Sequence, residues 1–300
     1  MLRRISARSG HRAAIYDLQP APDGFYSAAA DGFLVHWHRE DVDFGRVVAK
    51  VDGGKFFSLA TLPDGGLVAG AVDGGVHWLY PEAPERNLHV AHHRKGTYAV
   101  RLFGGQIFTG GGDGVLTRWD TATGRSLESF PLSANSLRSI AHYPKDDLLA
   151  VGASDGYVHV LHRATFEVIG KHRANDPSTF CVAFAPDVPW PRIVSGGRDA
   201  HLRFFDLAMS KGTPPPITAH LATVNALAYD PTGRYLATAS RDKTLKLWDA
   251  AEDYRLLKVC EVIRDRGHVN SVNTLLWLDE GTLLSAGDDR RVLEWRLAAQ

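Results

Sequence analysis

The chain has 300 residues, 44% of them hydrophobic, and its 34 lysines and arginines balance 34 aspartates and glutamates. This length and composition are enough to bury a sizeable core, and all-β chains of this size commonly form one domain, so we expect a single domain over residues 1–300. The balanced charge provides no global surface for a polyanion, which argues against nucleic acid as the main ligand.

Three further features bear on the compartment of the protein. The first ten residues are charged and contain no apolar segment, unlike a secretory signal, and no apolar run approaches the length of a membrane span. The two cysteines, Cys181 and Cys260, lie in apolar strand-like segments, which fits buried, reduced thiols better than a disulfide framework. We therefore expect a soluble cytoplasmic protein that does not bind membranes.

The first predicted strand covers residues 2–8, and a unit of four strands follows at 14–18, 25–30, 33–37 and 46–51. Asp31 occupies the tight turn between the second and third of these strands, and Trp37 lies six residues later. Aspartate suits such a turn because its side chain accepts hydrogen bonds from free backbone amides. One hairpin of this kind is marginal, since one face of its sheet would stay wet.

The same hairpin occurs seven times along the chain. The turn aspartates are Asp31, Asp73, Asp113, Asp155, Asp199, Asp242 and Asp289, and successive ones are 40–47 residues apart. Six residues after the turn lies a tryptophan in four copies and Leu79, Leu161 or Phe205 in the others. A period of this size indicates an array of supersecondary units, and seven copies leave no room for a second domain.

Three of the units depart from the common pattern. Unit two lacks an upstream histidine, and its Trp78 falls one position early. Unit four has Val151 and Leu161 where hydrogen-bonding residues stand elsewhere, and unit five has Asn175 in place of the histidine. Unit five also has a long first turn at 186–192, whose prolines require a loop. We expect these units to be held together less rigidly than the other four.

Histidine-containing dipeptides lie about twenty residues before four of the turn aspartates, at Gly10-His11, Ala91-His92, Ala219-His220 and Gly267-His268. Two units also close on Trp-Asp, at Trp119-Asp120 and Trp248-Asp249. The repeated pattern covers essentially the whole chain and resembles the WD-repeat β-propeller family, whose unit is a four-stranded blade. The resemblance implies an all-β fold, a seven-bladed β-propeller of four-stranded antiparallel blades.

The end of the chain predicts how the ring closes. Only five residues follow Trp295, too few for an outer strand like the one expected at 256–263 in unit six. In the family, the N-terminal segment commonly pairs with the last blade. We therefore expect the strand at 2–8 to complete blade seven, which also removes an open sheet edge.

In this family a histidine, a serine or threonine, the turn aspartate and the tryptophan form a hydrogen-bonded network inside one blade. The matching positions here predict four networks: His11, Ser27, Asp31 and Trp37; His92, Thr109, Asp113 and Trp119; His220, Thr238, Asp242 and Trp248; His268, Ser285, Asp289 and Trp295. Buried indole, hydroxyl and imidazole groups are costly unless paired, and pairing them with one another fixes the register of the blade.

Serine, histidine and aspartate together also suggest a hydrolase, but the set occurs four times and no Gly-x-Ser-x-Gly motif presents a nucleophile. We therefore predict no catalytic residues. His89, His92 and His93 suggest a metal site only weakly, because no carboxylate or cysteine lies nearby in sequence. The glycine-rich turn at 110–114 lacks the lysine and the helix of a phosphate loop. We expect neither metal nor cofactor.

The resemblance implies a non-catalytic scaffold that presents its loops to another protein or peptide. We expect the protein to be a monomer. One special case is a partner segment that is acidic or phosphorylated. The alternative is an enzyme with a metal or carboxylate site in the central channel, and metal analysis would distinguish the two.

The loops around the turn aspartates are the predicted binding face. The candidate contact residues there are Arg198, Arg241, Lys243, Arg290, Phe56 and Tyr98. Arginine and aromatic side chains are favoured anchors of protein interfaces. The competing interpretation is a solvated charged rim that neighbouring aspartates partly neutralise.

Overall fold

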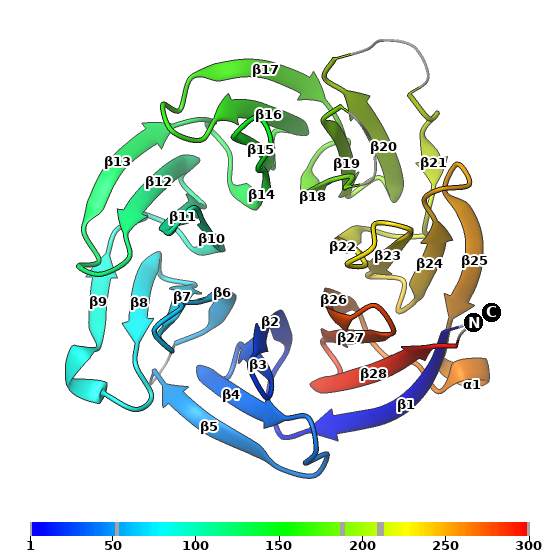
Figure 1. Cartoon of the computed structure of the whole chain (residues 1–300), viewed down its shortest axis with the longest axis horizontal. Coiled ribbons are helices and arrows are strands. Elements are labelled where there is room, and N and C mark those ends of the chain that lie inside the picture. The colour runs from blue at the N-terminus through cyan, green and yellow to red at the C-terminus, as the bar shows by residue number, and fades with distance from the viewer. Residues whose placement is uncertain (1, 52–53, 187–189, 209–212, 299–300) are drawn as a thin grey trace.

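A computed structural model describes residues 2–51, 54–186, 190–208 and 213–298. They form seven four-stranded antiparallel sheets arranged as a ring around a central channel (Figure 1). The predicted all-β, seven-bladed propeller is confirmed. In every blade except the last, the strands follow one another in chain order from the channel to the outer rim.

The strands of blades one to four are β2 (Ile15–Ala21), β3 (Gly24–Ala29), β4 (Phe33–His38) and β5 (Gly45–Lys50); β6 (Phe56–Thr61), β7 (Leu67–Ala71), β8 (Gly75–Leu79) and β9 (Leu88–Ala91); β10 (Thr97–Phe103), β11 (Gln106–Gly111), β12 (Val115–Asp120) and β13 (Ser126–Pro131); and β14 (Leu137–Tyr143), β15 (Leu148–Ala153), β16 (Tyr157–His162) and β17 (Val168–Arg173). A 3₁₀ turn, η1 (Pro84–Arg86), precedes β9.

Blades five to seven consist of β18 (Thr179–Phe184), β19 (Arg192–Gly197), β20 (His201–Asp206) and β21 (Ile217–Thr218); β22 (Val224–Tyr229), β23 (Tyr235–Ser240), β24 (Leu245–Asp249) and β25 (Arg255–Cys260); and β26 (Val272–Asp279), β27 (Thr282–Gly287) and β28 (Arg291–Leu297), completed by β1 (Leu2–Ser9). Part of the long turn expected at 186–192 lies outside the described residues, and β19 begins at Arg192.

The hydrophobic core is divided among the blade interfaces. Each of the seven core clusters joins residues of two adjacent blades, and together they account for all seven interfaces of the ring. The cluster between blades seven and one, for example, packs Trp37 and Ile15 against Leu284. A blade therefore buries its faces only against its neighbours, and the ring must close for the first and last blades to be covered.

Strand β1 closes the ring, as the length of the chain after Trp295 predicts. It pairs antiparallel with β28, from Leu2 opposite Leu297 to Ser9 opposite Arg291 (Figure 1). The pairing is reinforced by a buried ion pair, in which Arg8 Nη1 lies 2.7 Å from Glu294 Oε2. The N-terminal strand thus covers the edge that β28 would otherwise expose.

The outer strand of blade six is shorter than expected. β25 ends at Cys260 instead of continuing to residue 263, and a short helix, α1 (Val262–Asp265), follows it. Asp265 accounts for the end of the strand. Its carboxylate accepts a hydrogen bond from the backbone N–H of Glu261 and forms an ion pair with Lys258.

Both cysteines are buried and free of disulfides. Burial raises the pKa of both thiols, that of Cys260 to about 12. Neither helix in the described ranges is long and apolar enough to cross a membrane.

Candidate functional site: the Asp-turn face and channel mouth

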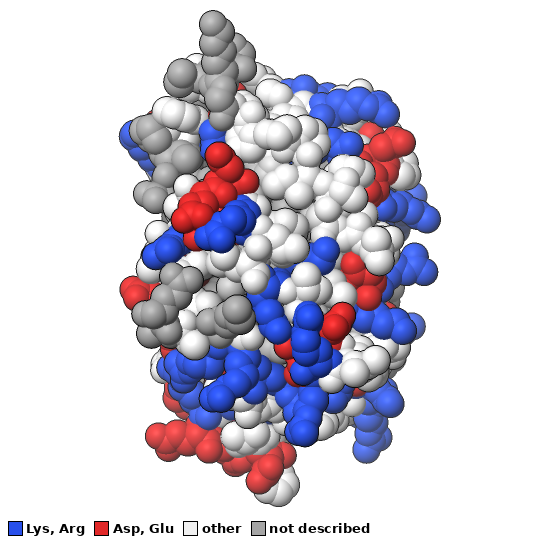
Figure 2. All heavy atoms as spheres, turned by 90° about the vertical axis from the view of Figure 1, so that its right-hand side faces the viewer, with Lys and Arg blue, Asp and Glu red and all other residues white. Residues whose placement is uncertain are grey.

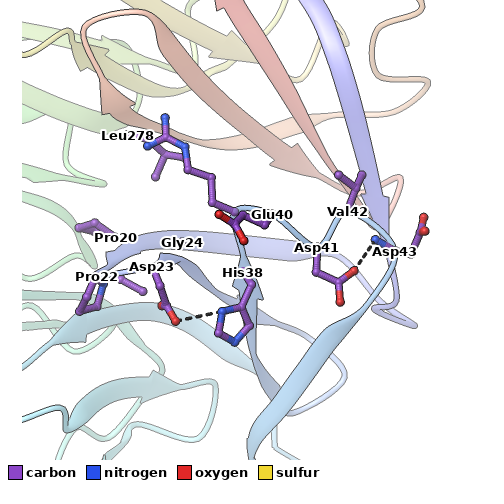
Figure 3. Close-up of a pocket in the computed structure, with 12 residues that line it drawn as sticks. Pro20, Pro22, Asp23, Gly24, His38, Glu40, Asp41, Val42, Asp43 and Leu278 are labelled. Atoms are coloured by element: carbon purple, nitrogen blue, oxygen red, sulfur yellow. Dashed lines mark hydrogen bonds and ion pairs between the residues drawn. The ribbon is translucent and has the colours of Figure 1, made fainter.

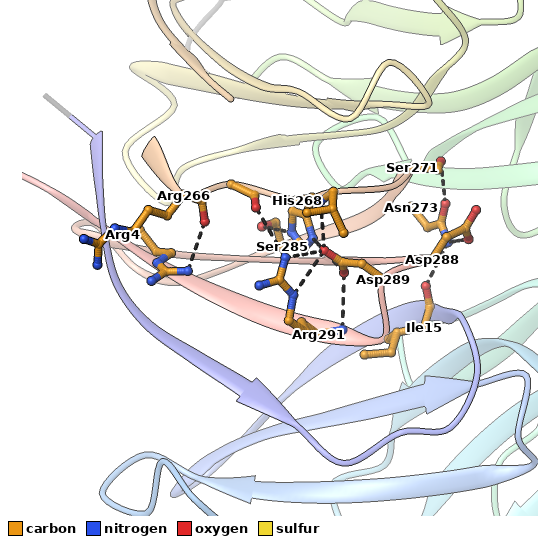
Figure 4. A network of polar contacts seen from close by, with 12 residues as sticks. Arg4, Ile15, Arg266, His268, Ser271, Asn273, Ser285, Asp288, Asp289 and Arg291 are labelled. Carbon is orange, nitrogen blue, oxygen red and sulfur yellow. Dashed lines mark hydrogen bonds and ion pairs between the residues drawn. The ribbon is translucent and has the colours of Figure 1, made fainter. Parts of the chain in front are cut away.

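Blade seven shows how a polar network holds an Asp turn in place (Figure 4). His268 Nδ1 lies 3.0 Å from each carboxylate oxygen of Asp289, and His268 Nε2 lies 2.8 Å from Ser285 Oγ. Trp295 Nε1 donates to the same hydroxyl at 2.8 Å. His268 lies in the loop that leads into blade seven. Its two ring nitrogens therefore tie this loop to the Asp289 turn and to Ser285 on β27.

Blades one and six contain the same arrangement at the expected positions. His11 bridges Asp31 (3.0 Å) and Ser27 (2.7 Å), and Trp37 donates to Ser27 at 2.8 Å. In blade six the corresponding distances are 3.0 Å from His220 to Asp242, 2.8 Å from His220 to Thr238 and 2.9 Å from Trp248 to Thr238.

The turn carboxylate of blade seven is held in its ionised form. Burial by itself would raise the pKa of Asp289, but the hydrogen bond and charge of His268 and the contact with Arg291 together lower it to about 2. The backbone N–H of the residue after the network histidine adds a further donor, as Val269 does to Asp289 at 3.2 Å. In the four blades with a histidine network, the Asp turn is therefore built on a nearly buried, charged and hydrogen-bonded carboxylate.

Blade three corrects one prediction: the network histidine is His93, and the predicted His92 is wrong. His93 Nδ1 lies 3.1 Å from Asp113, and His93 Nε2 lies 2.9 Å from Thr109 Oγ1, to which Trp119 also donates at 2.9 Å. His92 instead contacts Thr117 Oγ1 at 2.8 Å.

Spacing could not separate these two neighbouring histidines. The distance from network histidine to turn aspartate is 20 residues in blade one, 22 in blade six and 21 in blade seven. Both candidates in blade three fall within that variation.

Two of the three irregular blades replace the network with other hydrogen bonds, and the third lacks a replacement. In blade five Asn175 replaces the histidine: its amide donates to Asp199 at 2.9 Å and accepts from Ser195 at 2.9 Å. In blade four Ser133 donates to Asp155 at 3.0 Å. Blade two has a real deficit, because the buried indole nitrogen of Trp78 has no hydrogen-bond partner.

The structure leaves the four predicted basic contact residues in solvent. Arg198, Arg241, Lys243 and Arg290 are all exposed and belong to the Asp turns of blades five, six and seven. Arg291, by contrast, binds Asp289 at 2.9 Å and supports the turn.

Lys243 and Arg290 occupy a strained backbone position. The residue that follows the turn aspartate has a positive φ in all seven blades: Gly32, Gly74, Gly114, Gly156, Ala200, Lys243 and Arg290. Only glycine adopts this left-handed conformation freely. Lys243 (φ 74°) and Arg290 (φ 64°) therefore present charged side chains where glycine would fit more easily.

Phe56, the predicted aromatic contact of blade two, is fully buried, and that prediction is wrong. Its side chain belongs to the core cluster between blades one and two. The pairing of β6 with β7 shifts after Phe56, which makes the next residue the bulged one. Phe57, not Phe56, consequently faces the channel.

The same register shift occurs after the first residue of all seven innermost strands. The second residues of these strands together line the mouth of the channel: Tyr16, Phe57, Tyr98, Arg138, Phe180, Asn225 and Asn273. They surround a cavity of about 390 Å³. The predicted Tyr98 belongs to this ring, and the position shared by its members is the signal that would have identified the others.

Arg138 is the one basic member of the ring. Its guanidinium carbon lies 4.2 Å from the centroid of the Tyr98 ring and 5.4 Å from that of Phe180. Its Nε donates to the hydroxyl of Ser154, which precedes the turn aspartate of blade four, at 2.9 Å. This contact places the channel mouth on the Asp-turn face. A guanidinium clamped between aromatic rings is well suited to bind a carboxylate or phosphate.

Deeper in the channel, a charge pair built on the buried Asp17 links three blades. Asp17 of blade one accepts from Leu59 N of blade two at 2.9 Å and from Arg101 Nη1 of blade three at 3.0 Å. Asp17 is the one carboxylate among the described residues that line this part of the channel. Because Asp17 is already paired, its evident role is to join blades.

A second basic surface lies on the outer rim. Lysine and arginine side chains gather there around β1, β25 and α1 (Figure 2). Several are already engaged: Lys258 and Arg264 pair with Asp265, and Arg4 donates to the carbonyl of Arg266.

Comparison with known proteins agrees with the geometry. Residues 167–206, 213–249 and 259–296 match the family model described as WD domain, G-beta repeat. Three segments of the chain therefore match WD repeats, and the whole chain has the fold of a WD40 β-propeller. The crystal structure of the WD40 β-propeller domain of Doa1 superposes on 99% of this propeller, and on 97% of that chain, with a TM-score of 0.85. The sequence identity of 15% limits this likeness to the fold.

Relatives of the propeller cover part of its length. The WD repeat-containing protein SL1-17 of Schistosoma mansoni is 25% identical over 62% of this chain and 62% of its own. The target of rapamycin complex subunit wat1 of Schizosaccharomyces pombe is 28% identical over 53% of this chain and 48% of its own. The small ribosomal subunit protein RACK1y of Oryza sativa is 28% identical over 64% and 56%. The propeller thus spans about half to three fifths of these relatives.

Proposed function

We propose that this propeller is a non-catalytic scaffold that docks another protein on its Asp-turn face, at the channel mouth. The observation that carries the proposal is Arg138, held between Tyr98 and Phe180 beside a cavity of about 390 Å³. Aromatic rings and an arginine in a concave site are the features that anchor a partner side chain. Two relatives support a role in assemblies, since one is named as a complex subunit and another as a ribosomal subunit protein.

The charge distribution favours an acidic or phosphorylated segment of the partner. Arg138 in blade four is followed around the ring by the exposed Arg198, Arg241, Lys243 and Arg290 in blades five to seven. Guanidinium groups bind carboxylate and phosphate oxygens through paired hydrogen bonds. A partner segment would place an acidic group at Arg138 and run over the basic turns.

The strained turns give a second, independent argument. Holding a non-glycine residue at positive φ costs about 1 kcal/mol or more per position. Lys243 and Arg290 bear that cost at positions where four other blades have glycine. Exposed charges kept at strained positions are more consistent with binding than with a passive solvated rim.

A catalytic site in the channel has less support. Asp17, the described carboxylate of the channel lining, is bound by Leu59 N and Arg101 and has no free geometry for proton transfer or metal binding. The networks that combine serine, histidine and aspartate are buried inside blades and are repeated. Their chemistry is that of structural anchors.

Affinity capture from the native host tests the docking face. The bait proteins are the unaltered propeller, Arg138→Met, and the double variant Arg198→Glu/Arg241→Glu, with bound proteins quantified by mass spectrometry. A charge-matched control reverses two exposed arginines of the rim, Arg3→Glu/Arg266→Glu. We expect the two face variants to weaken the principal partner by about tenfold or more and to reduce its salt dependence.

The control separates the two surfaces. Partner binding that survives both face variants but is lost with the rim variant would move the docking site to β1, β25 and α1. Binding that none of the variants changes would refute the role of these charges altogether.

A further inference from the structure

The face opposite the Asp turns carries a cluster of two histidines and one aspartate. Asp23 lies in the turn between β2 and β3, and His36 and His38 lie near the end of β4. His36 and His38 project from the same side of the strand, because alternate residues share a face. The pairing of Gly24 with His38 brings this side next to Asp23 (Figure 3).

The three side chains converge on a small volume. His36 Nε2 lies 2.9 Å from Asp23 Oδ1, and His38 Nδ1 lies 2.9 Å from Asp23 Oδ2. All three donor atoms lie within 4.8 Å of one another. Among the described residues, this is the one group of three side chains with metal-ligand chemistry that meets so closely.

This geometry is close to that of a zinc site. Nitrogen and oxygen ligands about 2.0–2.2 Å from a tetrahedral ion lie about 3.3 Å from one another. The two 2.9 Å contacts with Asp23 would lengthen by a few tenths of an ångström to reach this spacing. Two imidazoles and a carboxylate form a ligand set that suits divalent transition metals and leaves the fourth position open.

The surrounding residues prepare the site. The Tyr26 ring stacks on His36 with centroids 4.6 Å apart and so fixes the orientation of that imidazole. His36 is nearly buried, whereas about half of the His38 side chain and half of the Asp23 side chain are exposed. One ligand is therefore rigid, and the other two can adjust to an ion arriving from solvent.

The open side of the cluster faces a cavity of about 900 Å³ between blades one and seven. Glu40, Asp41 and Asp43 line it (Figure 3). The one arginine of the lining, Arg39, is paired with Asp279. The carboxylates create a negative potential that attracts cations toward the three ligands.

We propose that Asp23, His36 and His38 bind a divalent transition-metal ion, with zinc as the expected occupant. The ion takes the place of the protons that the two imidazoles direct at Asp23, and each ring keeps its proton on the other nitrogen. A water molecule or a side chain of a second protein completes the coordination. The site lies on the face opposite the proposed docking surface and does not depend on it.

The test uses tag-free, chelator-treated protein titrated with Zn²⁺ by calorimetry and with Co²⁺ by visible absorption. We expect one ion per chain, a four-coordinate Co²⁺ spectrum and a higher melting temperature with zinc. His38→Ala and Asp23→Asn, which change exposed ligands and should leave the fold intact, should each weaken binding by about 100-fold or abolish it.

His142→Ala is the matched control. His142 Nε2 likewise lies 3.0 Å from Asp147, in the turn between β14 and β15, but among the described residues no second histidine joins this pair. This variant should bind zinc as the unaltered protein does. The proposal is overturned if the unaltered protein binds no ion, or if His38→Ala and Asp23→Asn retain its affinity and stoichiometry, which would locate any bound ion elsewhere.

Discussion

Replacing His93 with alanine should lower the free energy of unfolding by about 3 kcal/mol, whereas replacing the adjacent His92 should lower it by about 1 kcal/mol. The two residues differ by one position in sequence, yet only His93 joins the blade-three network. The pair therefore tests directly whether the network, and not a histidine in this loop, holds the blade together.

The larger loss of stability in His93→Ala follows from the hydrogen-bond partners that the missing side chain would leave unsatisfied. The pKa of His93 is lowered to about 4, mainly by burial, so the ring is neutral near pH 7. Asp113 accepts the Nδ1 proton, and Nε2 accepts the hydroxyl proton of Thr109, which in turn accepts from Trp119. Removing the ring loses two hydrogen bonds, at about 0.5–1.5 kcal/mol each, and leaves the buried Thr109 hydroxyl without an acceptor.

Removing the His92 side chain leaves fewer buried partners unsatisfied. Its Nε2 contacts Thr117 at 2.8 Å, and its ring packs edge-on against Trp119 at 4.5 Å. When the imidazole is removed, the Thr117 hydroxyl still has Ser129 as a partner at 3.1 Å. The expected loss of about 1 kcal/mol is that of one partly exposed hydrogen bond and one aromatic contact.

Urea unfolding followed by tryptophan fluorescence measures both changes through the shift in midpoint. A His93→Asn variant adds a rescue arm, because Asn175 performs the same bridging role in blade five. We expect the amide to restore half or more of the stability that alanine loses. Equal losses for the two alanine variants, or a larger loss for His92→Ala, would refute the assignment of the network.

Two further predictions concern ring closure and pH. Deleting residues 1–9 should lower the free energy of unfolding by about 3 kcal/mol or more and cause aggregation. The reason is that Glu294 stays buried without Arg8 and that the edge of β28 becomes exposed. An unchanged melting temperature would show that β1 does not close the ring. Burial lowers the pKa of His93 from 6.5 to about 4. As the pH falls, this side chain is therefore protonated in the unfolded chain before it is protonated in the folded protein. Stability should therefore be highest above about pH 6.5 and decrease toward about pH 4, by up to roughly 1 kcal/mol per unit, and His93→Asn should flatten this dependence in urea melts.

The sequence predicts the architecture well because the same physical requirement is repeated in every blade. Each hairpin needs a polar residue to close its turn and an apolar residue to cover its neighbour, so Asp242 and Trp248 stand at a spacing that recurs along the chain. Closure by the N-terminal strand follows from counting strands, since blade seven lacks an outer strand after Trp295.

The contact residues are harder to predict because they depend on register. A single bulge decides that Phe57 faces the channel while Phe56 is buried, and nothing in the composition of β6 distinguishes the two. Arg138 and Phe180 were missed for the same reason: their common environment is a position in the ring, not a motif along the chain. Asp23 and His38 likewise meet only through the pairing of β3 with β4.

The residue that follows each turn aspartate reflects both the repeated demand of the turn and a feature particular to its own blade. In blades one to four glycine meets the demand of the backbone for a positive φ, as at Gly114, where an added Cβ would lie 1.8 Å from the carbonyl oxygen of Ser133. Blades six and seven meet the same demand with Lys243 and Arg290, at a cost in local conformational energy. The hairpin gains nothing from a charge there, because both side chains point into solvent. Our proposal that the partner carries an acidic or phosphorylated segment gives these two charges a role, and Arg138 of blade four adds a third basic group at the channel mouth on the same face.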